Sequence, residues 1–438
     1  MKALSPLDDR YHAKVGVLGD YFSDEAFLRN RVYIEQRYLE TLLKRIGMKA
    51  ELKALFAPIK ESDIEAIRQI ETKGWQGISA TNHDGKAIEY FLKSRLSGQL
   101  KEFVHFGLTT EDVSNLALGL MLKGALTALI MPRLTELTEI ISDMAKAYKD
   151  VPMLGRTHGQ FASPTTFGKE LLVFAKRLEN ELAVLQREKI PGKLSGAVGT
   201  YSALKFAYPE INWVAFATGF VKELGLEPVS VTTQTVPAEG YLHVFNSLHI
   251  INSILLDFCQ DMWRYISDGW VVQAPNAGEV GSSVMPHKVN PIYFENAEGN
   301  LKLANALLEC FCRELPVSRL QRDLSDSTIK RNFGVALGHC YLAYDSCMKG
   351  LERIEPDVSL MLQIVKSHPE VLSEAFQTEL RKHVPEPYEM LKAMTRGKDT
   401  TLAELHAFID KLKVPTAVKR KLKSLKPEEY LGEIDKLF

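Results

Sequence analysis

Residues 244–265, VFNSLHIINSILLDFCQDMWRY, carry the most regular apolar pattern in the chain. Steps of four and three residues alternate strictly between successive apolar side chains. This is the spacing of a helix that packs along a coiled-coil seam. The stretch therefore predicts one long helix of a bundle. The seam residues are Val244, Leu248, Ile251, Leu255, Phe258, Met262 and Tyr265.

Four further stretches repeat apolar residues at helical spacing. The first begins at Thr109-Thr110-Glu111-Asp112, which has a hydroxyl cap and acids in the first turn, and it continues past Pro132, which should kink it. The second begins at Ser163-Pro164, the third follows Pro291, and the fourth starts at Phe333. Hardly any strand signal lies between them, so the sequence predicts an all-α fold built around a long helical bundle.

The rest of the chain is predicted to form shorter helices on either side of this bundle. Several bundle helices also carry apolar residues off the main seam, such as Ile254 beside Leu255. A bundle that is apolar on more than one side usually has a partner, so we expect an oligomer. The predicted domains are an N-terminal helical domain (1–105), the central long-helix bundle (106–352) and a C-terminal helical domain (353–438).

The bulk composition excludes several classes of protein. The 438 residues are 45% hydrophobic and 25% charged, with a formal net charge of −1, so no global field favours nucleic acid or an acidic membrane. No apolar run approaches the roughly 20 residues of a membrane span, and the N-terminal sequence is not typical of a signal peptide. The 5 cysteines form no C-x-x-C pair and the 11 histidines show no metal-ligand spacing. We therefore expect a cytoplasmic protein without a metal.

The loop Gly281-Ser282-Ser283-Val284-Met285-Pro286-His287-Lys288-Val289-Asn290-Pro291 is too polar for a core element. Asn290 is the expected N-cap of the helix that follows, and Pro291 its first residue. With the cation of Lys288, this loop suits an anion held over the positive end of a helix. Taken alone, however, a Gly-Ser-Ser sequence is more often a surface loop with a capping role.

Other polar loops are also candidates for chemistry. Histidine is a natural proton donor near neutral pH, and the loop-borne candidates are His83, His105, His158 and His287. His249 and His339 lie in helical stretches and are interpreted as structural. The stretch Pro191-Gly192-Lys193-Leu194-Ser195-Gly196-Ala197-Val198-Gly199 is not a Walker loop, because its Gly-Lys comes first, and a structural loop is the favoured interpretation.

The pattern Gly281-Ser282-x-x-Met285-x-x-Lys288-x-Asn290 resembles the signature of the fumarase/aspartase superfamily, whose members eliminate fumarate from a succinyl compound. Within that superfamily, the chain is most similar to the branch that cleaves adenylosuccinate. This resemblance covers nearly the whole length and implies a fumarase/aspartase-like fold. The segments that carry it are Ser5–Tyr11, Thr81–Asp84, His105–Asp112, Arg156–Gln160 and Gln321–Thr328.

The resemblance also implies roles for individual residues. His158 would be the general acid that protonates the purine-side nitrogen, and Ser282 the general base. A serine alkoxide is costly near neutral pH, so the loop amides and Lys288 would have to stabilise it. Arg10, Tyr11, Ser327 and Arg331 would hold the 5′-phosphate and ribose, with His83 near the phosphate. The other implied substrate contacts are Asn82, Asp84, Thr109, Thr110, Gln234, Lys288, Asn290, Asn296, Arg322, Thr328, Ile329 and Lys330.

The implied reaction is β-elimination of fumarate from adenylosuccinate, giving AMP, and from succinylaminoimidazole carboxamide ribotide, giving AICAR, in purine nucleotide biosynthesis. The resemblance implies no cofactor, and it implies a homotetramer whose active sites are shared between chains. The rivals are another fumarate-releasing lyase, such as argininosuccinate lyase or fumarase, and a non-catalytic structural homologue. The substrates of those rival lyases carry no phosphate. A non-catalytic structural protein has no need for Ser282, His158 and Lys288 together.

Some of these roles rest on the resemblance alone. Arg10 and Tyr11 by themselves are better interpreted as a surface pair. Arg322 and Arg331 lie near a predicted helix start, where solvated side chains are common. Phe161 departs from the family pattern, which often has proline there, whereas Thr110 replaces a common serine and keeps the hydroxyl.

Overall fold

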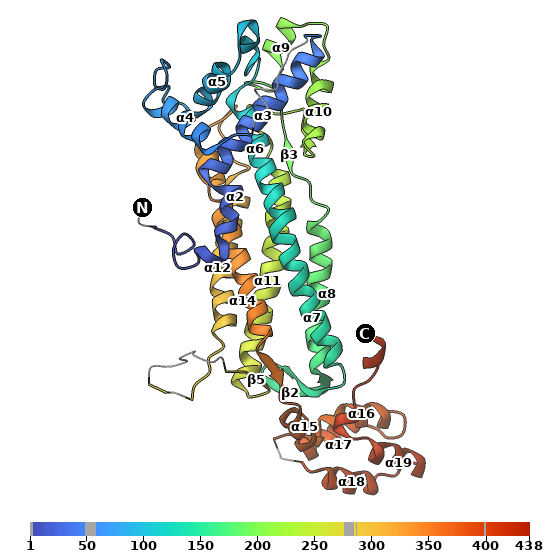
Figure 1. Cartoon of the computed structure of the whole chain (residues 1–438). Coiled ribbons are helices and arrows are strands. Elements are labelled where there is room, and N and C mark those ends of the chain that lie inside the picture. Colours follow the sequence, from blue (N-terminus) through green and yellow to red (C-terminus); the bar gives the residue numbers. More distant parts are fainter. Residues whose placement is uncertain (1–2, 49–57, 276–283, 286, 398–399) are drawn as a thin grey trace. The chain divides into compact units, whose positions relative to one another are not determined.

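The computed structural model describes residues 3–48, 58–275, 284–285, 287–397 and 400–438. The chain divides into two compact units, and the division falls within the long helices α7, α8, α11, α12 and α14. The first unit comprises residues 1–134, 181–253 and 299–343, and the second comprises 135–180, 254–298 and 344–438. Helices dominate both units, which confirms the all-α prediction (Figure 1). The division into three domains stays a prediction.

The long helices lie where the apolar periodicity predicted them. The seam residues between Val244 and Tyr265 are all buried in α11, so the four-three alternation marks its inner face. Helix α12 begins one residue later than predicted, directly after Pro291. The bounds of these helices are α7 (Met131–Ala147), α8 (Phe167–Leu185), α11 (Glu239–Ser267), α12 (Ile292–Glu314) and α14 (Phe333–Leu351).

The helix that begins at Thr110 passes Pro132 through a π-helical segment. Helix α6 (Thr110–Ala125) leads into η3 (Leu126–Ile130), and α7 then carries Pro132 in its first turn. A proline ring clashes with the carbonyl four residues before it, which here is residue 128, inside the widened turn. The expected kink site is therefore a π-bulge, a recognised cause of helix bending.

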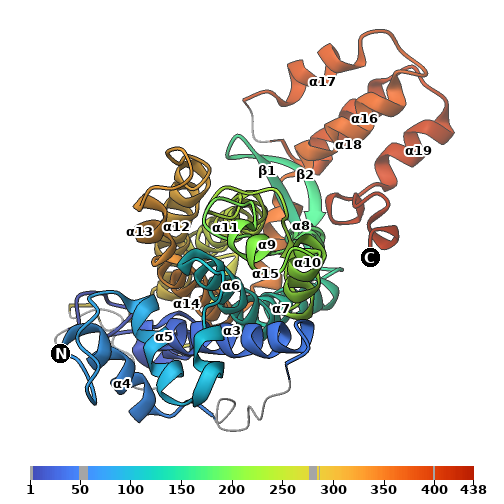
Figure 2. The same ribbon diagram turned by 90° about the horizontal axis from the view of Figure 1, so that it is seen from above.

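The N-terminal part of the first unit is built from short helices around one long helix. Helix α3 (Asp24–Arg45) packs against α6 and α5, and α4 packs against α5 (Figures 1 and 2). Ser23 begins α3 by accepting a 3.1 Å hydrogen bond from the backbone N–H of Ala26. The other elements of this unit are α1 (His12–Val15), α2 (Gly19–Phe22), α4 (Glu61–Thr72), α5 (Asp84–Ser94), β3 (Pro191–Gly192), α9 (Ser202–Ala207), α10 (Trp213–Glu223), β4 (Glu227–Pro228) and α13 (Ser325–Lys330).

One predicted helix start was wrong. Ser163 and Pro164 lie in strand β2 (Gln160–Thr166), which pairs antiparallel with β1 (Pro152–Thr157). The helix begins only at Phe167, because Thr166 supplies the cap by accepting a 3.1 Å hydrogen bond from the Lys169 N–H. At the tip of this hairpin, His158 and Gly159 have φ angles of 53° and 75°, as in a two-residue type I′ turn.

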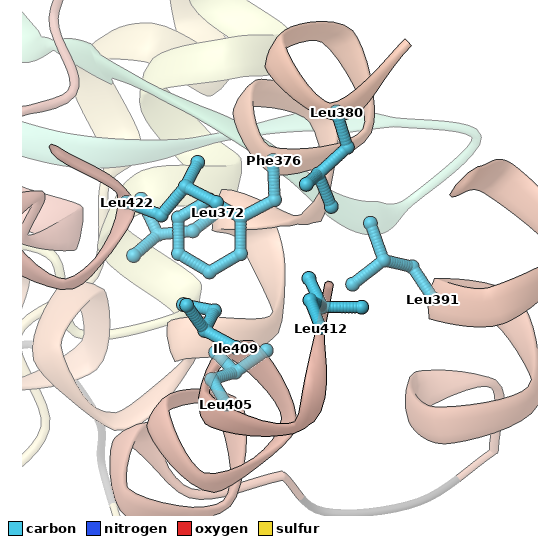
Figure 3. Close-up of a cluster of buried hydrophobic side chains, with 8 residues drawn as sticks. All are labelled: Leu372, Phe376, Leu380, Leu391, Leu405, Ile409, Leu412 and Leu422. Carbon is cyan, nitrogen blue, oxygen red and sulfur yellow. The ribbon is translucent and has the colours of Figure 1, made fainter. Parts of the chain in front are cut away.

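The C-terminal helices of the second unit surround their own apolar cluster. Side chains from α16, α17, α18 and α19 point toward one another there (Figure 3). The cluster consists of Leu372, Phe376, Leu380, Leu391, Leu405, Ile409, Leu412 and Leu422. The remaining α-helices and strands of this unit are β5 (Val271–Gln273), β6 (Ile354–Pro356), α15 (Val358–Ser367), α16 (Ser373–Leu380), α17 (Pro387–Thr395), α18 (Leu402–Lys411) and α19 (Thr416–Ser424).

Within the described residues, two helical stretches are long and apolar enough to cross a membrane, Thr110–Ala147 and Glu239–Ser267. Their most apolar windows are 61% and 56% buried by the rest of the protein. Core helices pass the same test of length and composition, so these stretches are weak evidence for a membrane span.

Candidate active site

A cavity of about 780 Å³ lies in the first unit. Side chains from the starts of α5 and α6, from the loop before α11, and from the α13 region meet in its wall. These segments lie far apart in the sequence, yet each carries residues that the resemblance had selected. The predicted site residues that line the cavity are His83, Asp84, Thr109, Thr110, Gln234, Arg322, Ser327, Lys330 and Arg331.

One wall of the cavity is basic. Arg322 donates from Nη2 to the hydroxyl of Ser327 at 3.0 Å and from Nη1 to Oε1 of Gln234 at 3.4 Å. Its buried Nε has no hydrogen-bond partner within the described part of the chain. Arg331 is more open, with 61% of its side chain exposed, and it lies 3.3 Å from Asp24. Two guanidinium groups beside a hydroxyl are well suited to a phosphate.

A buried carboxylate in the cavity wall lies beside these cations. Glu111 lies 3.4 Å from Nη2 of Arg322 and 3.5 Å from Nζ of Lys330. Burial raises the pKa of the Glu111 carboxyl above its ordinary value, although the charges of Lys330 and Arg322 act in the opposite direction. The carboxylate therefore anchors both cations. Asp326 adds a 2.6 Å contact to Lys330.

A second wall is formed where α5 begins. His83 is the N-cap of α5, and its Nδ1 accepts a 3.2 Å hydrogen bond from the Lys86 N–H. The neutral ring therefore carries its proton on Nε2, where it can donate. A Cβ on Gly85 would lie 2.9 Å from Cγ2 of Thr110, so glycine is needed where α5 meets the start of α6.

The start of α6 holds the two threonines. The N–H of Thr109 donates to Oδ2 of Asp112 at 2.9 Å, and the two residues form a capping box at the helix start that the sequence predicted. Thr110 follows as the first helical residue and lines the cavity. The capping box therefore fixes the backbone at Thr110, whose side chain lines the cavity.

Sequence reasoning missed several residues of the cavity wall. Arg31 and Asp24 lie on α3, and Glu111, Ser114 and Asn115 lie on α6. Helical periodicity assigns such residues to a face but does not identify their partners, which are distant in the chain. For such residues the sequence offers one signal, which is a charged side chain within an otherwise apolar face of a helix.

Five predicted contacts of the first unit do not line this cavity: Arg10, Tyr11, Asn82, Thr328 and Ile329. The guanidinium of Arg10 lies 5.9 Å from the centre of the Tyr11 ring. A second cavity of about 210 Å³ is lined by residues of the same N-terminal segment, including Asp8 and His12. Ser23 and Arg331 line both cavities, so this segment approaches the basic wall.

The remaining predicted site residues belong to the second unit. His158 is exposed at the tip of the β1–β2 hairpin, Lys288 is exposed, and Asn290 is half-buried. Asn296 accepts a 2.8 Å hydrogen bond from the hydroxyl of Ser346. Ser282 lies outside the described residues. The catalytic roles of His158 and Ser282 therefore stay predictions.

The other candidate histidines separate into two groups. His105 lies 2.5 Å from Glu35, whose hydrogen bond and charge outweigh the effect of burial and raise the pKa of the imidazole. His287 is exposed. His249 pairs with Glu309 at 2.9 Å and His339 with Asn300 at 2.8 Å, which fits the structural interpretation of both helical histidines.

Comparisons with known proteins give a consistent result. Residues 9–307 match the family described as lyase, and residues 318–431 match the family described as adenylosuccinate lyase C-terminal. The chain is 42% identical to the adenylosuccinate lyases of Haemophilus influenzae and Escherichia coli K12, over 99% of this chain and 97% of each relative. The adenylosuccinate lyase of Dictyostelium discoideum is 41% identical, with the same coverage.

Solved structures with low sequence identity share the fold. A fumarate lyase from Mesorhizobium sp. BNC1 superimposes with a TM-score of 0.74 at 18% identity, covering 96% of both chains. The 3-carboxy-cis,cis-muconate lactonizing enzyme from Pseudomonas putida also has a TM-score of 0.74, at 20% identity, covering 99% of this chain and 97% of that one. The fold expected from the sequence is thereby confirmed.

Proposed function

Because this chain belongs to the adenylosuccinate lyase family, we propose that its cavity binds the phosphate and ribose of a succinylated purine nucleotide. The enzyme is a carbon–nitrogen lyase that releases fumarate from adenylosuccinate, leaving AMP, and from succinylaminoimidazole carboxamide ribotide, leaving AICAR. The substrates are small molecules, and the purine nucleotide part carries the phosphate that distinguishes them from argininosuccinate and malate.

The observation that carries this proposal is the basic wall of the cavity. Arg322, Lys330 and Arg331 all line the cavity, and Arg322 donates to the hydroxyl of Ser327. Among the residues that the structure describes, the buried Nε of Arg322 has no hydrogen-bond partner. Guanidinium forks recognise phosphate oxygens in pairs, and a phosphate would satisfy such a donor. Argininosuccinate lyase and fumarase act on substrates without phosphate, for which this wall has no use.

The elimination itself needs a base, an acid and stabilisation of the carbanion. The proton to be removed lies next to a carboxylate, so the carbanion adds a second negative charge to that end of the substrate. Ser282 takes this proton, and Lys288 and Asn290 stabilise the charge that develops. His158 protonates the nitrogen that leaves with the purine part. His83 contacts the nucleotide near the phosphate.

The proposal includes a homotetramer with shared active sites, located in the cytoplasm. Large apolar side chains are exposed on the long helices. They are Val173 and Val184 on α8, Ile250 and Trp263 on α11, and Leu303 on α12, each at least 40% exposed. Such side chains suit helix packing between subunits.

The direct test is fumarate release, followed by ultraviolet absorbance, with adenylosuccinate, argininosuccinate and malate offered in parallel. Turnover of adenylosuccinate alone is the expected result, and equal turnover of argininosuccinate would contradict the proposed use of the basic wall. His158→Ala and Ser282→Ala should each lower kcat by roughly 10²–10⁴-fold with circular dichroism unchanged, because each removes a proton-transfer group. Near-normal turnover in either variant would exclude that residue from the chemistry.

A further inference from the structure

A buried ion pair involves the first turn of α6. Nζ of Lys193 is 2.9 Å from Oδ1 of Asp112, and both side chains are 0% exposed. Burial of two charges costs free energy that their mutual attraction alone often fails to recover. A pair in this position therefore calls for a reason beyond stability.

The hydrogen bonds of the pair reach two separate segments of backbone. Asp112 accepts from the N–H of Thr109 at 2.9 Å and from the N–H of Ser195 at 2.9 Å. The N–H of Gly196 approaches both carboxylate oxygens, at 3.2 and 3.1 Å. Lys193 in turn donates to the carbonyl of Gly196 at 2.9 Å. The carboxylate thus joins the start of α6 to the loop that follows β3.

Asn115 strengthens the same junction. Its Oδ1 accepts from the Lys193 N–H at 2.8 Å, and its Nδ2 donates to the Lys193 carbonyl at 3.0 Å. Asn115 also lines the cavity. Two side chains of α6, Asp112 and Asn115, therefore hold the loop against this helix.

The same loop also contacts Gln234, another residue of the cavity wall. The carbonyl of Ala197 accepts a 3.1 Å hydrogen bond from Nε2 of Gln234, whose Oε1 accepts from Arg322. The hydroxyls of Ser195 and Thr232 are 2.8 Å apart. At Gly199, with φ of 77°, a Cβ would lie 2.0 Å from the Thr232 carbonyl oxygen, so the two segments are in direct contact.

We propose that Asp112 and Lys193 are positioning residues, which set the separation of Thr110 and Gln234 in the cavity wall and thereby the affinity for substrate. The proposal rests on the proposed function, because it assigns substrate contact to those two residues. It also gives a role to the loop between Pro191 and Gly199, which the sequence had favoured as purely structural. Neither Asp112 nor Lys193 lines the cavity, so both act through the backbone that they hold.

The test compares Asp112→Asn with the double variant Asp112→Asn/Lys193→Met. The single variant leaves a buried ammonium without its partner, so both its Tm and its substrate affinity should fall. The double variant removes the orphaned charge and should recover most of the Tm. An amide has a single acceptor oxygen and cannot replace the bonds to Thr109, Ser195 and Gly196. KM should therefore stay raised by roughly tenfold, the effect of about one lost hydrogen bond.

If KM of the double variant returned to normal together with Tm, the pair would be structural only, and the inference would be overturned. The double variant also serves when the single variant fails to fold. Asp63→Asn is the matched control, because Asp63 likewise completes a capping box and pairs with Arg95, but does not line the cavity. It should lower Tm and leave KM unchanged. A raised KM in Asp63→Asn would show that a loss of stability alone is enough to raise KM, and would also overturn the inference.

A variant of Gln234 separates this inference from the proposed function. Gln234→Ala alone should raise KM for adenylosuccinate, and an unchanged KM would contradict the proposed substrate contact itself. In the Gln234→Ala background, Asp112→Asn should raise KM by a smaller factor than in the parent enzyme, since part of its action passes through Gln234. If the two substitutions instead raised KM by independent factors that multiply, the substrate contact of Gln234 would stand and the positioning role of Asp112 would be refuted.

Discussion

Arg31 donates from Nη1 to Oδ2 of Asp84 at 2.8 Å, and this bond ties the middle of α3 to the first residue of α5. Only 4% of the Arg31 side chain is exposed, and its guanidinium lies 4.3 Å from the centre of the Phe27 ring. Asp84 directly follows His83 and also accepts a 2.6 Å hydrogen bond from the N–H of Gly85. A residue that sequence reasoning missed therefore fixes the wall of the cavity that carries His83.

Replacement of Arg31 should destabilise the protein in a pH-dependent manner. Burial would raise the pKa of Asp84, but the charge and hydrogen bond of Arg31 outweigh it and hold this pKa below its ordinary value. The stabilisation is therefore complete above the unfolded pKa of about 3.9, and it is lost as the pH falls through the lower folded pKa. Arg31→Gln should lower the free energy of unfolding at pH 7 by about 1–3 kcal/mol.

Urea denaturation of the parent and the Arg31→Gln variant checks this expectation. The difference in the free energy of unfolding between parent and variant should be constant from pH 7 to about pH 5. It should become smaller below about pH 4. Arg37→Gln is the control on the same helix, since Arg37 forms a more exposed pair with Glu40 and should cost less than about 1 kcal/mol. A difference that is independent of pH would show that Asp84 is not the partner that matters.

Arg331→Ala should mainly raise KM. A phosphate is held equally in the ground state and the transition state, so its loss weakens binding without slowing the chemistry. Loss of a charged hydrogen bond corresponds to roughly a tenfold to hundredfold higher KM. Inorganic phosphate should compete with substrate in the parent enzyme and compete less in the variant.

Arg319→Ala is the matched control for Arg331. Arg319 lies on the same segment, is 83% exposed, pairs with Asp323 and does not line the cavity. Its KM and its inhibition by phosphate should match those of the parent. If Arg331→Ala showed the same KM and the same inhibition by phosphate as Arg319→Ala, Arg331 would not be a substrate-binding residue.

The sequence predicted the long helices because their pattern repeats over many turns. In α11 the spacing from Val244 to Tyr265 specifies both the helix and its buried face. The start of α6 was also predicted, because its hydroxyl cap and the acids of its first turn are neighbours in the sequence. The hairpin was missed because Ser163-Pro164 imitates a helix start, whereas the true cap, Thr166, has no such local signature.

The site residues stay a prediction, and those that line the cavity were all selected by the family pattern. The resemblance selected nine residues of the cavity wall, but it did not select Arg31 or Glu111. Their partners are distant in the chain: Arg31 reaches Asp84, and Glu111 reaches Arg322 and Lys330. Local spacing contains no information on such pairs, because they form only when the helices pack.

Phe161, which departs from the family pattern, has a packing role that leads to another prediction. The guanidinium of Arg156 contacts two rings that stack on each other, and it lies 4.8 Å from the centre of Phe161 and 4.7 Å from that of Trp270. Asp268 binds the same guanidinium at 3.0 Å. This stack holds the hairpin whose tip carries His158, and each cation–π contact of this kind stabilises by about 0.5–1 kcal/mol.

Phe161→Ala should therefore loosen the hairpin. The expected result is a kcat lower by roughly tenfold with a smaller change in KM, since a displaced general acid slows proton transfer more than binding. The fluorescence of Trp270 should change as its neighbour is lost. Phe206→Ala is the control, because Phe206 is 91% exposed, and it should leave kcat and fluorescence unaltered. An unaltered kcat in Phe161→Ala would show that the stack does not position His158.

The shared active site can be tested by mixing two inactive variants. If the His158 hairpin and the Ser282 loop of one site come from different subunits, tetramers of His158→Ala and Ser282→Ala chains will contain some sites with both residues intact. Partial denaturation and joint refolding of the two variants should then restore part of the parent activity, although neither variant is active when refolded alone. Differently tagged chains recovered in one tetramer would verify that subunits had exchanged. Exchange without restored activity would place both residues of each site on a single chain, and would contradict the shared site.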